Sequence, residues 1–224
     1  KFLFTRISDY VETSKILKRK KIKSWVHMPV QTFPFYTFLI NKLKKEKEFE
    51  ILIKGPEKNL GCNAIHYLGI YYEIIRNNEF KINIAELDKK IVSSKRKGYI
   101  EFNGKIIFSS LDNKRILSVD FPRGKKRDYT TEIFFKNYKI MYNNLLGKCS
   151  FTDLKRKKRN QIKMYEVPYV SNNTHQYVNQ ILRTGNSRLP NFDKSALLHK
   201  KLLTNFLKHM NKNFKKKNKS CLIT

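Results

Sequence analysis

Four basic clusters carry the strongest chemical signal in the sequence. They span residues 17–23, 123–127, 155–159 and 212–219. Each cluster could bring several cations to phosphate groups, and aromatic side chains such as Tyr129, Phe134 and Tyr138 lie between them. Clustered cations interleaved with aromatic residues are typical of nucleic-acid-binding surfaces. RNA is favoured over DNA, because the sequence has no recognition-helix, zinc-finger or zipper pattern.

The overall charge supports this interpretation. The 224 residues include 48 Lys and Arg against 18 Asp and Glu, which gives a formal net charge of +30. Such an excess opposes compaction unless a polyanion neutralises it. The 40% of hydrophobic residues is enough for a core and excludes a purely disordered basic tail. The sequence has no apolar run long enough to span a membrane, so we expect no membrane partner.

The sequence signals for a catalytic site are weaker than the signal of the basic clusters. The carboxylates of Asp112, Asp120, Asp128 and Glu132 are close in sequence and could surround a metal, as in a nuclease. Lysines and arginines interleave with them, which favours ordinary ion pairs. The segment 55–61 lacks the Gly-Lys-Ser/Thr of a phosphate-binding loop, and the histidines lack metal-ligand spacing. We therefore predict no catalytic residue, no metal, no cofactor and no enzymatic activity.

Residue usage indicates a cellular setting. Cys62, Cys149 and Cys221 are odd in number and far apart, so we predict three free thiols. The chain has 37 Lys but 11 Arg, together with 21 Asn, and A/T-rich codons encode the favoured residues. Such usage is typical of an organelle genome. It predicts a protein of the mitochondrial matrix.

The first half of the sequence predicts a small α+β unit over residues 1–112. Helical spacing covers 34–45 and 64–75, and strand-like alternation covers 49–54 and 80–84. The Asn103-Gly104 pair between two alternating segments predicts a β-hairpin with a type I′ turn.

The second half predicts mostly helices. We expect them over 132–146, over about 151–165 with the 155–159 cluster on the outer face, and around 177–183. A last helix is expected to begin at Asp193 as its cap and to bury an apolar stripe before the basic tail. The expected fold is thus an α+β N-terminal extension (1–112), a mainly α-helical domain (113–192), and an amphipathic helix with a basic C-terminal tail (193–224).

One segment resembles a known family. Residues 115–127 read Arg-Ile-Leu-Ser-Val-Asp-Phe-Pro-Arg-Gly-Lys-Lys-Arg. They resemble the opening of the universal ribosomal protein thirteen family of the small subunit, where Arg-Ile-x-Gly-Val-Asp-Ile-Pro precedes a basic turn. The resemblance extends over residues 114–190. It implies a structural protein of the mitochondrial small-subunit head that binds ribosomal RNA and neighbouring head proteins, near the peptidyl-site tRNA and the bridge to the large subunit.

The basic clusters and this resemblance together define the predicted RNA contacts. They are Lys114, Arg115, Arg123, Lys125, Lys126, Arg127, Lys155, Arg156, Lys157, Lys158, Arg159, Arg183, Arg188, Lys215, Lys216, Lys217 and Lys219. Three alternatives stay open. They are a different mitochondrial ribosomal protein of the small subunit, an organelle-encoded nuclease built on Asp120 and Glu132, and a basic protein that lies on a membrane through residues 193–210.

Overall fold

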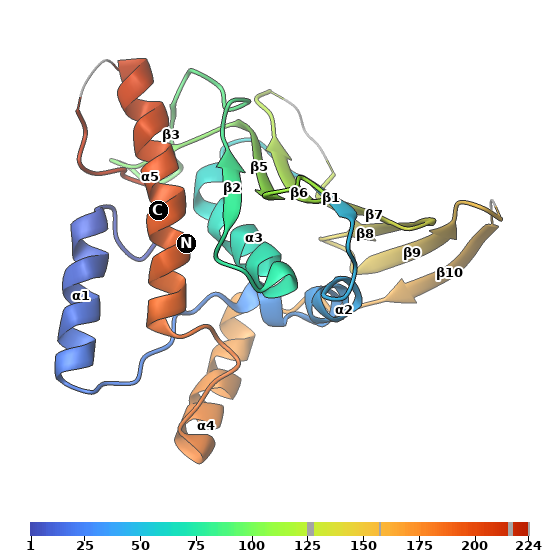
Figure 1. Cartoon of the computed structure of the whole chain (residues 1–224), viewed down its shortest axis with the longest axis horizontal. Helices are drawn as coiled ribbons and strands as arrows, with labels where there is room; N and C mark the ends of the chain where they lie inside the picture. Colours follow the sequence, from blue (N-terminus) through green and yellow to red (C-terminus); the bar gives the residue numbers. More distant parts are fainter. Residues whose placement is uncertain (125–127, 157, 215–216, 224) are drawn as a thin grey trace.

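A mixed β-sheet with helices packed on one face dominates the molecule (Figure 1). The structure is a computed structural model that describes residues 1–124, 128–156, 158–214 and 217–223, with only the backbone described for 158–161. Within these residues the eight-stranded sheet has the order β10-β9-β8-β7-β1-β6-β5-β2. Its strands are β1 (Phe49–Lys54), β2 (Phe80–Asn83), β5 (Gly104–Ser110), β6 (Arg115–Phe121), β7 (Thr130–Phe135), β8 (Tyr138–Asn143), β9 (Lys148–Asp153) and β10 (Lys158–Met164).

The other elements complete the chain. A separate two-stranded sheet pairs β3 with β4. The α-helices, 3-10 helices and these two strands are α1 (Ile7–Arg19), η1 (Pro29–Thr32), α2 (Pro34–Leu43), α3 (Leu60–Ile75), β3 (Val92–Ser93), β4 (Ile100–Glu101), η2 (Val170–Asn173), α4 (Thr174–Thr184) and α5 (Phe192–Phe214). No helix among the described residues is long and apolar enough to cross a membrane.

One strand pair of the large sheet is parallel. Strands β1 and β6 run in the same direction, with Ile51 opposite Leu117 and Lys54 opposite Asp120, whereas the other described pairs are antiparallel. Both strands therefore end at the same side of the sheet. We call this side, with the loops that follow β1 and β6, the β1/β6 edge.

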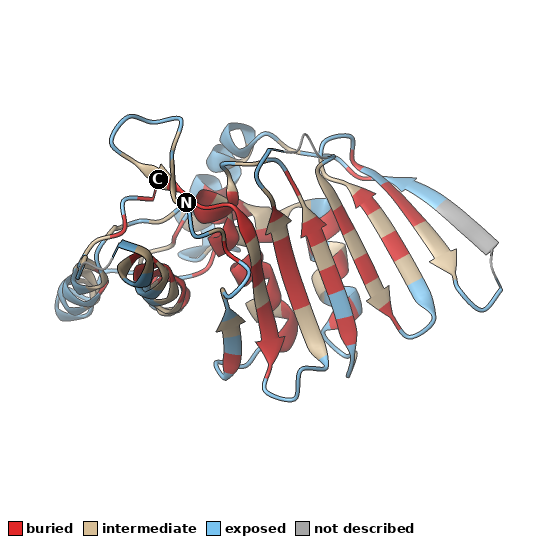
Figure 2. Ribbon diagram, turned by 90° about the horizontal axis from the view of Figure 1, so that it is seen from above, coloured by how far each residue is buried: buried red, intermediate tan, exposed pale blue. Residues whose placement is uncertain are grey.

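The core lies between the sheet and α3. Side chains alternate along β1, so that Ile51 and Ile53 are fully buried against the helical layer, and Val119 of β6 joins them. Helix α3 is apolar on most of its surface and packs behind the central strands, whose buried residues are red in Figure 2. Burying each such side chain stabilises the fold by about 1.5–3 kcal/mol.

Helix α5 closes a second part of the core, against α1 and α3. Its stripe of Leu202, Leu203 and Phe206 is fully buried, and the Phe206 ring stacks on Phe102 with centroids 4.6 Å apart. The predicted burial of this stripe is confirmed. Asp193 lies in the first turn of α5, but its carboxylate accepts a hydrogen bond from Ser14 and pairs with Lys18 instead of capping the helix.

Sequence periodicity located several elements correctly. Helices α2, α3 and α4 and strands β1 and β2 lie within a few residues of their predicted positions. The predicted boundary between residues 112 and 113 falls in the turn between β5 and β6, which pair directly within one sheet.

The predicted mainly helical domain over 113–192 is wrong. Residues 132–146 form most of β7 and β8, and 151–165 contain the end of β9, a turn and β10. Buried and less buried residues alternate along β7, with Thr131, Ile133 and Phe135 facing the core. This period of two, in a segment rich in aromatic and β-branched residues, is that of a strand.

The predicted hairpin at Asn103-Gly104 is also wrong. Strand β4 pairs with β3, whereas β5 pairs with β2 and β6. Gly104 has a φ of 104°, and a Cβ there would lie 2.4 Å from the backbone oxygen of Glu86. The glycine is needed for a close approach to the 86–88 segment, where the Asp88 N–H donates to the Asn103 carbonyl oxygen (3.0 Å).

Candidate functional site at the β1/β6 edge

A cavity of about 530 Å³ opens at the β1/β6 edge. Its walls come from the loop between β1 and α3, the loop after β6 and the segment that carries β3, and Asn103 lies between them. Ligands of sheets with parallel strands bind outside the carboxyl ends of those strands. The cavity is therefore where this topology favours a binding site. Its lining residues are Glu57, Lys58, Lys90, Ile91, Val92, Ser93, Asn103, Arg123 and Gly124.

The buried carboxylate of Glu101 accepts hydrogen bonds from the start of α3, next to this cavity. The backbone N–H of Gly61 donates to Oε2 of Glu101 (2.8 Å), and that of Cys62 donates to Oε1 (3.1 Å). A Cβ on residue 61 would lie 2.8 Å from the same Oε2, so glycine permits the approach. Burial raises the pKa of Glu101, although these hydrogen bonds act against the shift. The positive end of the α3 dipole is thus already paired with an anion of the chain.

Asn103 has a side-chain donor without a partner. The residue is 1% exposed, and its Oδ1 accepts a hydrogen bond from the backbone N–H of Lys58 (2.7 Å). This bond fixes the orientation of the amide, because only the oxygen can accept. The Nδ2 atom is buried and has no hydrogen-bond partner among the described residues. An unpartnered buried donor costs about 1–3 kcal/mol.

The charged residues of the cavity are mostly cationic. Lys58, Lys90 and Arg123 line it together with one carboxylate, Glu57. Glu57 accepts a hydrogen bond from the Gly124 backbone N–H (2.7 Å), and its Oε1 lies 3.9 Å from Nζ of Lys58. Among the described lining residues, three cations face one anion.

Two further titratable groups lie on α3, one turn apart. Burial raises the pKa of the Cys62 thiol to about 12, with the Glu101 charge acting in the same direction, so the thiol stays protonated at neutral pH. Burial lowers the pKa of His66 well below its ordinary value, so its ring is neutral. Its Nδ1 is buried without a partner in the described chain, and its Nε2 meets the backbone nitrogen of Lys1 in an exposed contact (3.0 Å).

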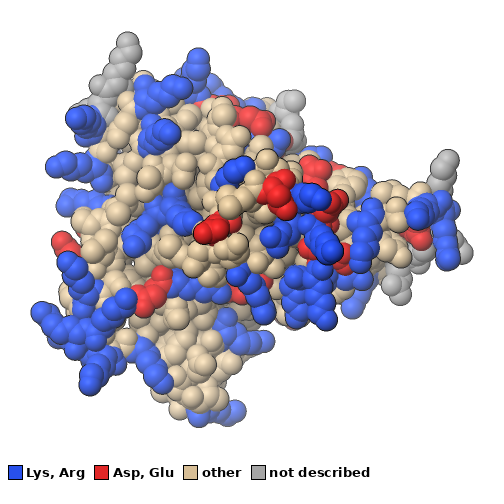
Figure 3. Space-filling model, viewed as in Figure 1, with Lys and Arg blue, Asp and Glu red and all other residues tan. Residues whose placement is uncertain are grey.

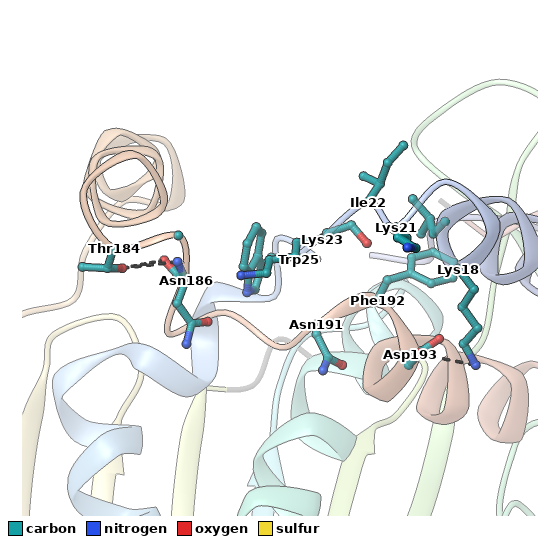
Figure 4. A pocket seen from close by; sticks show the side chains of 13 residues that line it. Lys18, Lys21, Ile22, Lys23, Trp25, Thr184, Asn186, Asn191, Phe192 and Asp193 are labelled. Atoms are coloured by element: carbon teal, nitrogen blue, oxygen red, sulfur yellow. Dashed lines mark hydrogen bonds and ion pairs between the residues drawn. The ribbon is translucent and has the colours of Figure 1, made fainter.

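A second cavity, of about 560 Å³, lies between the end of α1 and the linker from α4 to α5 (Figure 4). Lys18, Lys21, Lys23 and Trp25 line it, and Lys18 lies 3.7 Å from Asp193. The described side chains that line it include no buried polar atom without a partner. This cavity therefore has cations but no unsatisfied group that requires a ligand.

The predicted RNA contacts do not form one surface. Lysines and arginines (blue) are scattered over the face of the molecule seen in Figure 3, with acidic residues (red) among them. Lys114 pairs with Glu48, Arg115 begins β6, and Arg183 and Arg188 lie on and after α4. Lys155 and Arg156 occupy a turn between strands and not the predicted helix, Lys158 and Arg159 belong to β10, and Lys217 and Lys219 are exposed near the end. Lys125, Lys126, Arg127, Lys157, Lys215 and Lys216 lie outside the described residues.

Of the predicted contacts that the structure describes, Arg123 alone lines the edge cavity. Glu132 binds Lys54 and Lys139, as the prediction of ordinary ion pairs expects. Among the described residues there is no cluster of three or more His, Cys, Asp or Glu that could hold a metal. The three cysteines are free and buried, which confirms that prediction.

No protein-family model matches the sequence, and no curated protein matches it. Solved structures do resemble the fold. Levoglucosan dehydrogenase in complex with NADH superposes with a TM-score of 0.63 at 11% identity, covering 93% of this chain and 69% of that one. UDP-N-acetylglucosamine 3-dehydrogenase GnnA from Acidithiobacillus ferrooxidans gives 0.58 at 9% identity, covering 92% and 66%.

A third similar structure is the WlbA dehydrogenase from Bordetella pertussis in complex with NADH and UDP-GlcNAcA. It gives a TM-score of 0.55 at 9% identity, covering 92% of this chain and 66% of that one. The chain thus spans about two thirds of the length of these structures.

These likenesses overturn the ribosomal interpretation. The structural neighbours are oxidoreductases, so the predictions of a ribosomal protein, of ribosomal RNA, tRNA and ribosomal-protein partners, and of a non-enzyme are wrong, and the nuclease alternative has no support. The resemblance over 114–190 rested on residues that form β6 and the strands after it, not the helices of that family. At such low identity the comparison defines the fold: a mixed dehydrogenase-type sheet, Rossmann-like in the strand–loop–helix of β1 and α3.

Proposed function

We propose that this chain forms the sugar-binding part of an oxidoreductase. The observation that carries the proposal is the match of its eight-stranded mixed sheet, with the attached helices, to dehydrogenase structures over 92–93% of the chain. Two of those enzymes are named for a sugar or a nucleotide sugar, the WlbA structure contains UDP-GlcNAcA, and two of the three structures contain NADH. The substrate class proposed here is accordingly a sugar with an oxidisable hydroxyl group.

The start of α3, where this topology would favour a dinucleotide, does not fit one. A pyrophosphate needs free backbone N–H groups at the start of the helix that follows the strand. At α3 the Gly61 and Cys62 amides already bind the carboxylate of Glu101. The turn from Gly55 to Gly61 also lacks the spaced glycines of a dinucleotide fingerprint. We therefore assign the sugar to this chain, and a nicotinamide that takes up the hydride must bind away from the start of α3.

His66 is the residue that could take a proton from the sugar. Oxidation of a hydroxyl to a carbonyl transfers a hydride to an oxidant, here the added NAD⁺, and releases a proton, which a neutral imidazole can accept. The His66 ring is neutral because burial lowers its pKa, although the same shift makes it a weaker base. Its Nε2 contacts the Lys1 backbone nitrogen (3.0 Å), which a sugar hydroxyl would have to displace, and the ring does not line the cavity at the β1/β6 edge. Cys62, one turn away, stays protonated and cannot serve as a base.

The test is oxidation of sugars by the purified chain in the presence of NAD⁺, followed by the absorbance of NADH. A panel of neutral, phosphorylated and carboxylated sugars samples the substrate class. His66→Gln should lower kcat by about a hundredfold or more while KM changes little, as expected for loss of a general base.

His175→Gln is the matched control, because His175 is an exposed histidine on α4. Its kcat should equal that of the unchanged chain. Absence of turnover and of sugar binding across the panel would refute the proposed function. Equal kcat in the two histidine variants would refute the role of His66.

A further inference from the structure

We infer that the cavity at the β1/β6 edge binds a phosphate or carboxylate group of the substrate. The inference rests on the proposed function for the sugar to which this group belongs. It goes further by specifying an anionic sugar and the residues that recognise its charge.

The first argument is the unpartnered amide of Asn103. Asn103 lines the cavity, and its Nδ2 is buried at the wall and can only donate, while its Oδ1 is occupied by the Lys58 backbone N–H. A ligand oxygen in the cavity would satisfy this donor and remove the cost of leaving it unpaired. A phosphate or carboxylate oxygen accepts such a bond more strongly than a neutral hydroxyl does.

The second argument is the charge of the walls. Lys58 and Arg123 come from the loops after β1 and β6, and Lys90 comes from the segment before β3. Three separate parts of the chain thus direct cations to one cavity. A guanidinium group also matches both oxygens of a carboxylate or phosphate.

Glu57 limits where the anion can lie. Its carboxylate accepts the Gly124 backbone N–H and lies 3.9 Å from Nζ of Lys58, so the anion should contact Asn103 and the cations and avoid the like charge of Glu57. Glu57 is then available to accept a hydrogen bond from a hydroxyl of the sugar. One cavity could in this way recognise both the charge and a hydroxyl of one ligand.

Binding is measured by titration calorimetry on the whole chain, independently of turnover. The probes are glucose phosphorylated at its primary hydroxyl, glucuronate, inorganic phosphate and glucose. At least one charged sugar should bind about tenfold or more tightly than glucose, because charge-assisted hydrogen bonds are roughly twice as strong as neutral ones. The phosphorylated sugar and glucuronate distinguish a phosphate from a carboxylate.

Trp25 reports on the other cavity. It is the only tryptophan of the chain and lines the cavity of Figure 4, not the edge cavity. Binding at the edge should leave its fluorescence unchanged. A fluorescence change that follows the calorimetric binding curve would show that the anion binds in the second cavity and would overturn the inference.

Substitutions locate the site. Arg123→Gln combined with Lys58→Gln should weaken binding of the charged sugar by about tenfold or more and leave the affinity for glucose unchanged. Both residues are exposed, so folding should be retained. The matched control, Arg183→Gln with Lys23→Gln, removes the same charge from α4 and from the second cavity.

Asn103→Asp provides the third variant, since it keeps the oxygen that binds Lys58 and replaces the donor with a second oxygen. It should abolish preference for the charged sugar. Equal binding of charged and neutral sugars, or equal losses in the test and control pairs, would refute the anion site even if sugars are oxidised. Tight, Arg123-dependent binding without any turnover would instead support the site and refute the proposed function.

Discussion

The β1/β6 edge and the turn between β9 and β10 are both rich in polar groups, but they differ in burial. At the edge, Glu101 is 2% exposed and binds two backbone amides, and Asn103 is 1% exposed with one donor unpaired. In the turn, the Arg156 side chain is 80% exposed and lies 4.0 Å from Asp153. Water screens the second set and not the first. The difference shows that the number of charges in a segment does not locate a site, whereas burial of polar groups does.

The largest effect should come from Glu101. In Glu101→Ala the amides of Gly61 and Cys62 lose their acceptor in a buried position, at about 1–3 kcal/mol for each. We expect a total loss of about 3 kcal/mol in the free energy of unfolding, measured with urea. Glu48→Ala, which removes an exposed partner of Lys114, should change it by less than about 0.5 kcal/mol. Similar losses in both variants would show that burial of a polar group does not decide how much it contributes to stability.

Acidification should lower the free energy of unfolding through the buried histidines. Burial lowers the pKa of His199 from 6.5 to about 4, and the pKa of His66 moves in the same direction. The unfolded chain then binds protons that the folded chain excludes, so stability is retained above about pH 6.5 and falls as the pH drops toward 4. For His199 the loss is about 3 kcal/mol, at 1.36 kcal/mol for each pKa unit.

Urea unfolding at several pH values measures this loss. His199→Asn keeps a donor toward the Ser195 carbonyl oxygen, which His199 Nδ1 approaches at 2.7 Å, but removes the titration. The variant should therefore show a flatter pH dependence than the unchanged chain. Parallel pH profiles for the two proteins would contradict the assignment to His199.

Glu132 should have an intermediate effect. Its carboxylate is 13% exposed on the sheet face opposite α3 and binds Lys54 and Lys139. Burial acts to raise its pKa, but hydrogen bonds from the two lysines outweigh burial and lower it. Glu132→Gln should cost about 1 kcal/mol, less than Glu101→Ala. A loss as large as that of Glu101→Ala would show that the ion pairs of Glu132 contribute as much to stability as the buried hydrogen bonds of Glu101.

The smallest effect should come from the β9–β10 turn. Lys155→Gln with Arg156→Gln removes two exposed cations and should change the free energy of unfolding by less than about 0.5 kcal/mol. Thermal unfolding at low and high salt provides the measurement. A loss of more than about 1 kcal/mol would mean that the turn contributes as a buried region does.

Local periodicity predicted much of the fold. The spacing of Ala64, Leu68 and Tyr71 identified α3, and the apolar stripe from Leu198 to Met210 identified α5 and its burial. The second half failed because strands were read as helices: Ile133, Phe135 and Ile140 fit a strand period, while a ribosomal motif favoured helices. Pairing between β1 and β6 joins residues more than sixty apart, and no local pattern encodes it.

The candidate site was less predictable. The Asn-Gly signal pointed to a hairpin, yet Asn103 is held by Lys58, and the β1–α3 loop that carries Lys58 was read only as a simple turn. A usable signal was present: Glu101 and Asn103 are polar residues within an apolar, aromatic segment, where burial requires defined partners. Composition predicted the net charge but not that the cations would be scattered over the face seen in Figure 3. The mitochondrial location stays a prediction.

Strand β10 gives the basic residues another role. It is the last strand of the sheet, and its outer backbone groups could pair with a strand of another molecule. Ile162 and Met164 are exposed on this strand, so such pairing would be favoured by burial of apolar surface. Lys163 lies between them, and Lys155 and Arg156 lie in the turn before the strand. Like charges there would repel a second copy, so cations that resemble an RNA-binding cluster instead protect an open sheet against aggregation.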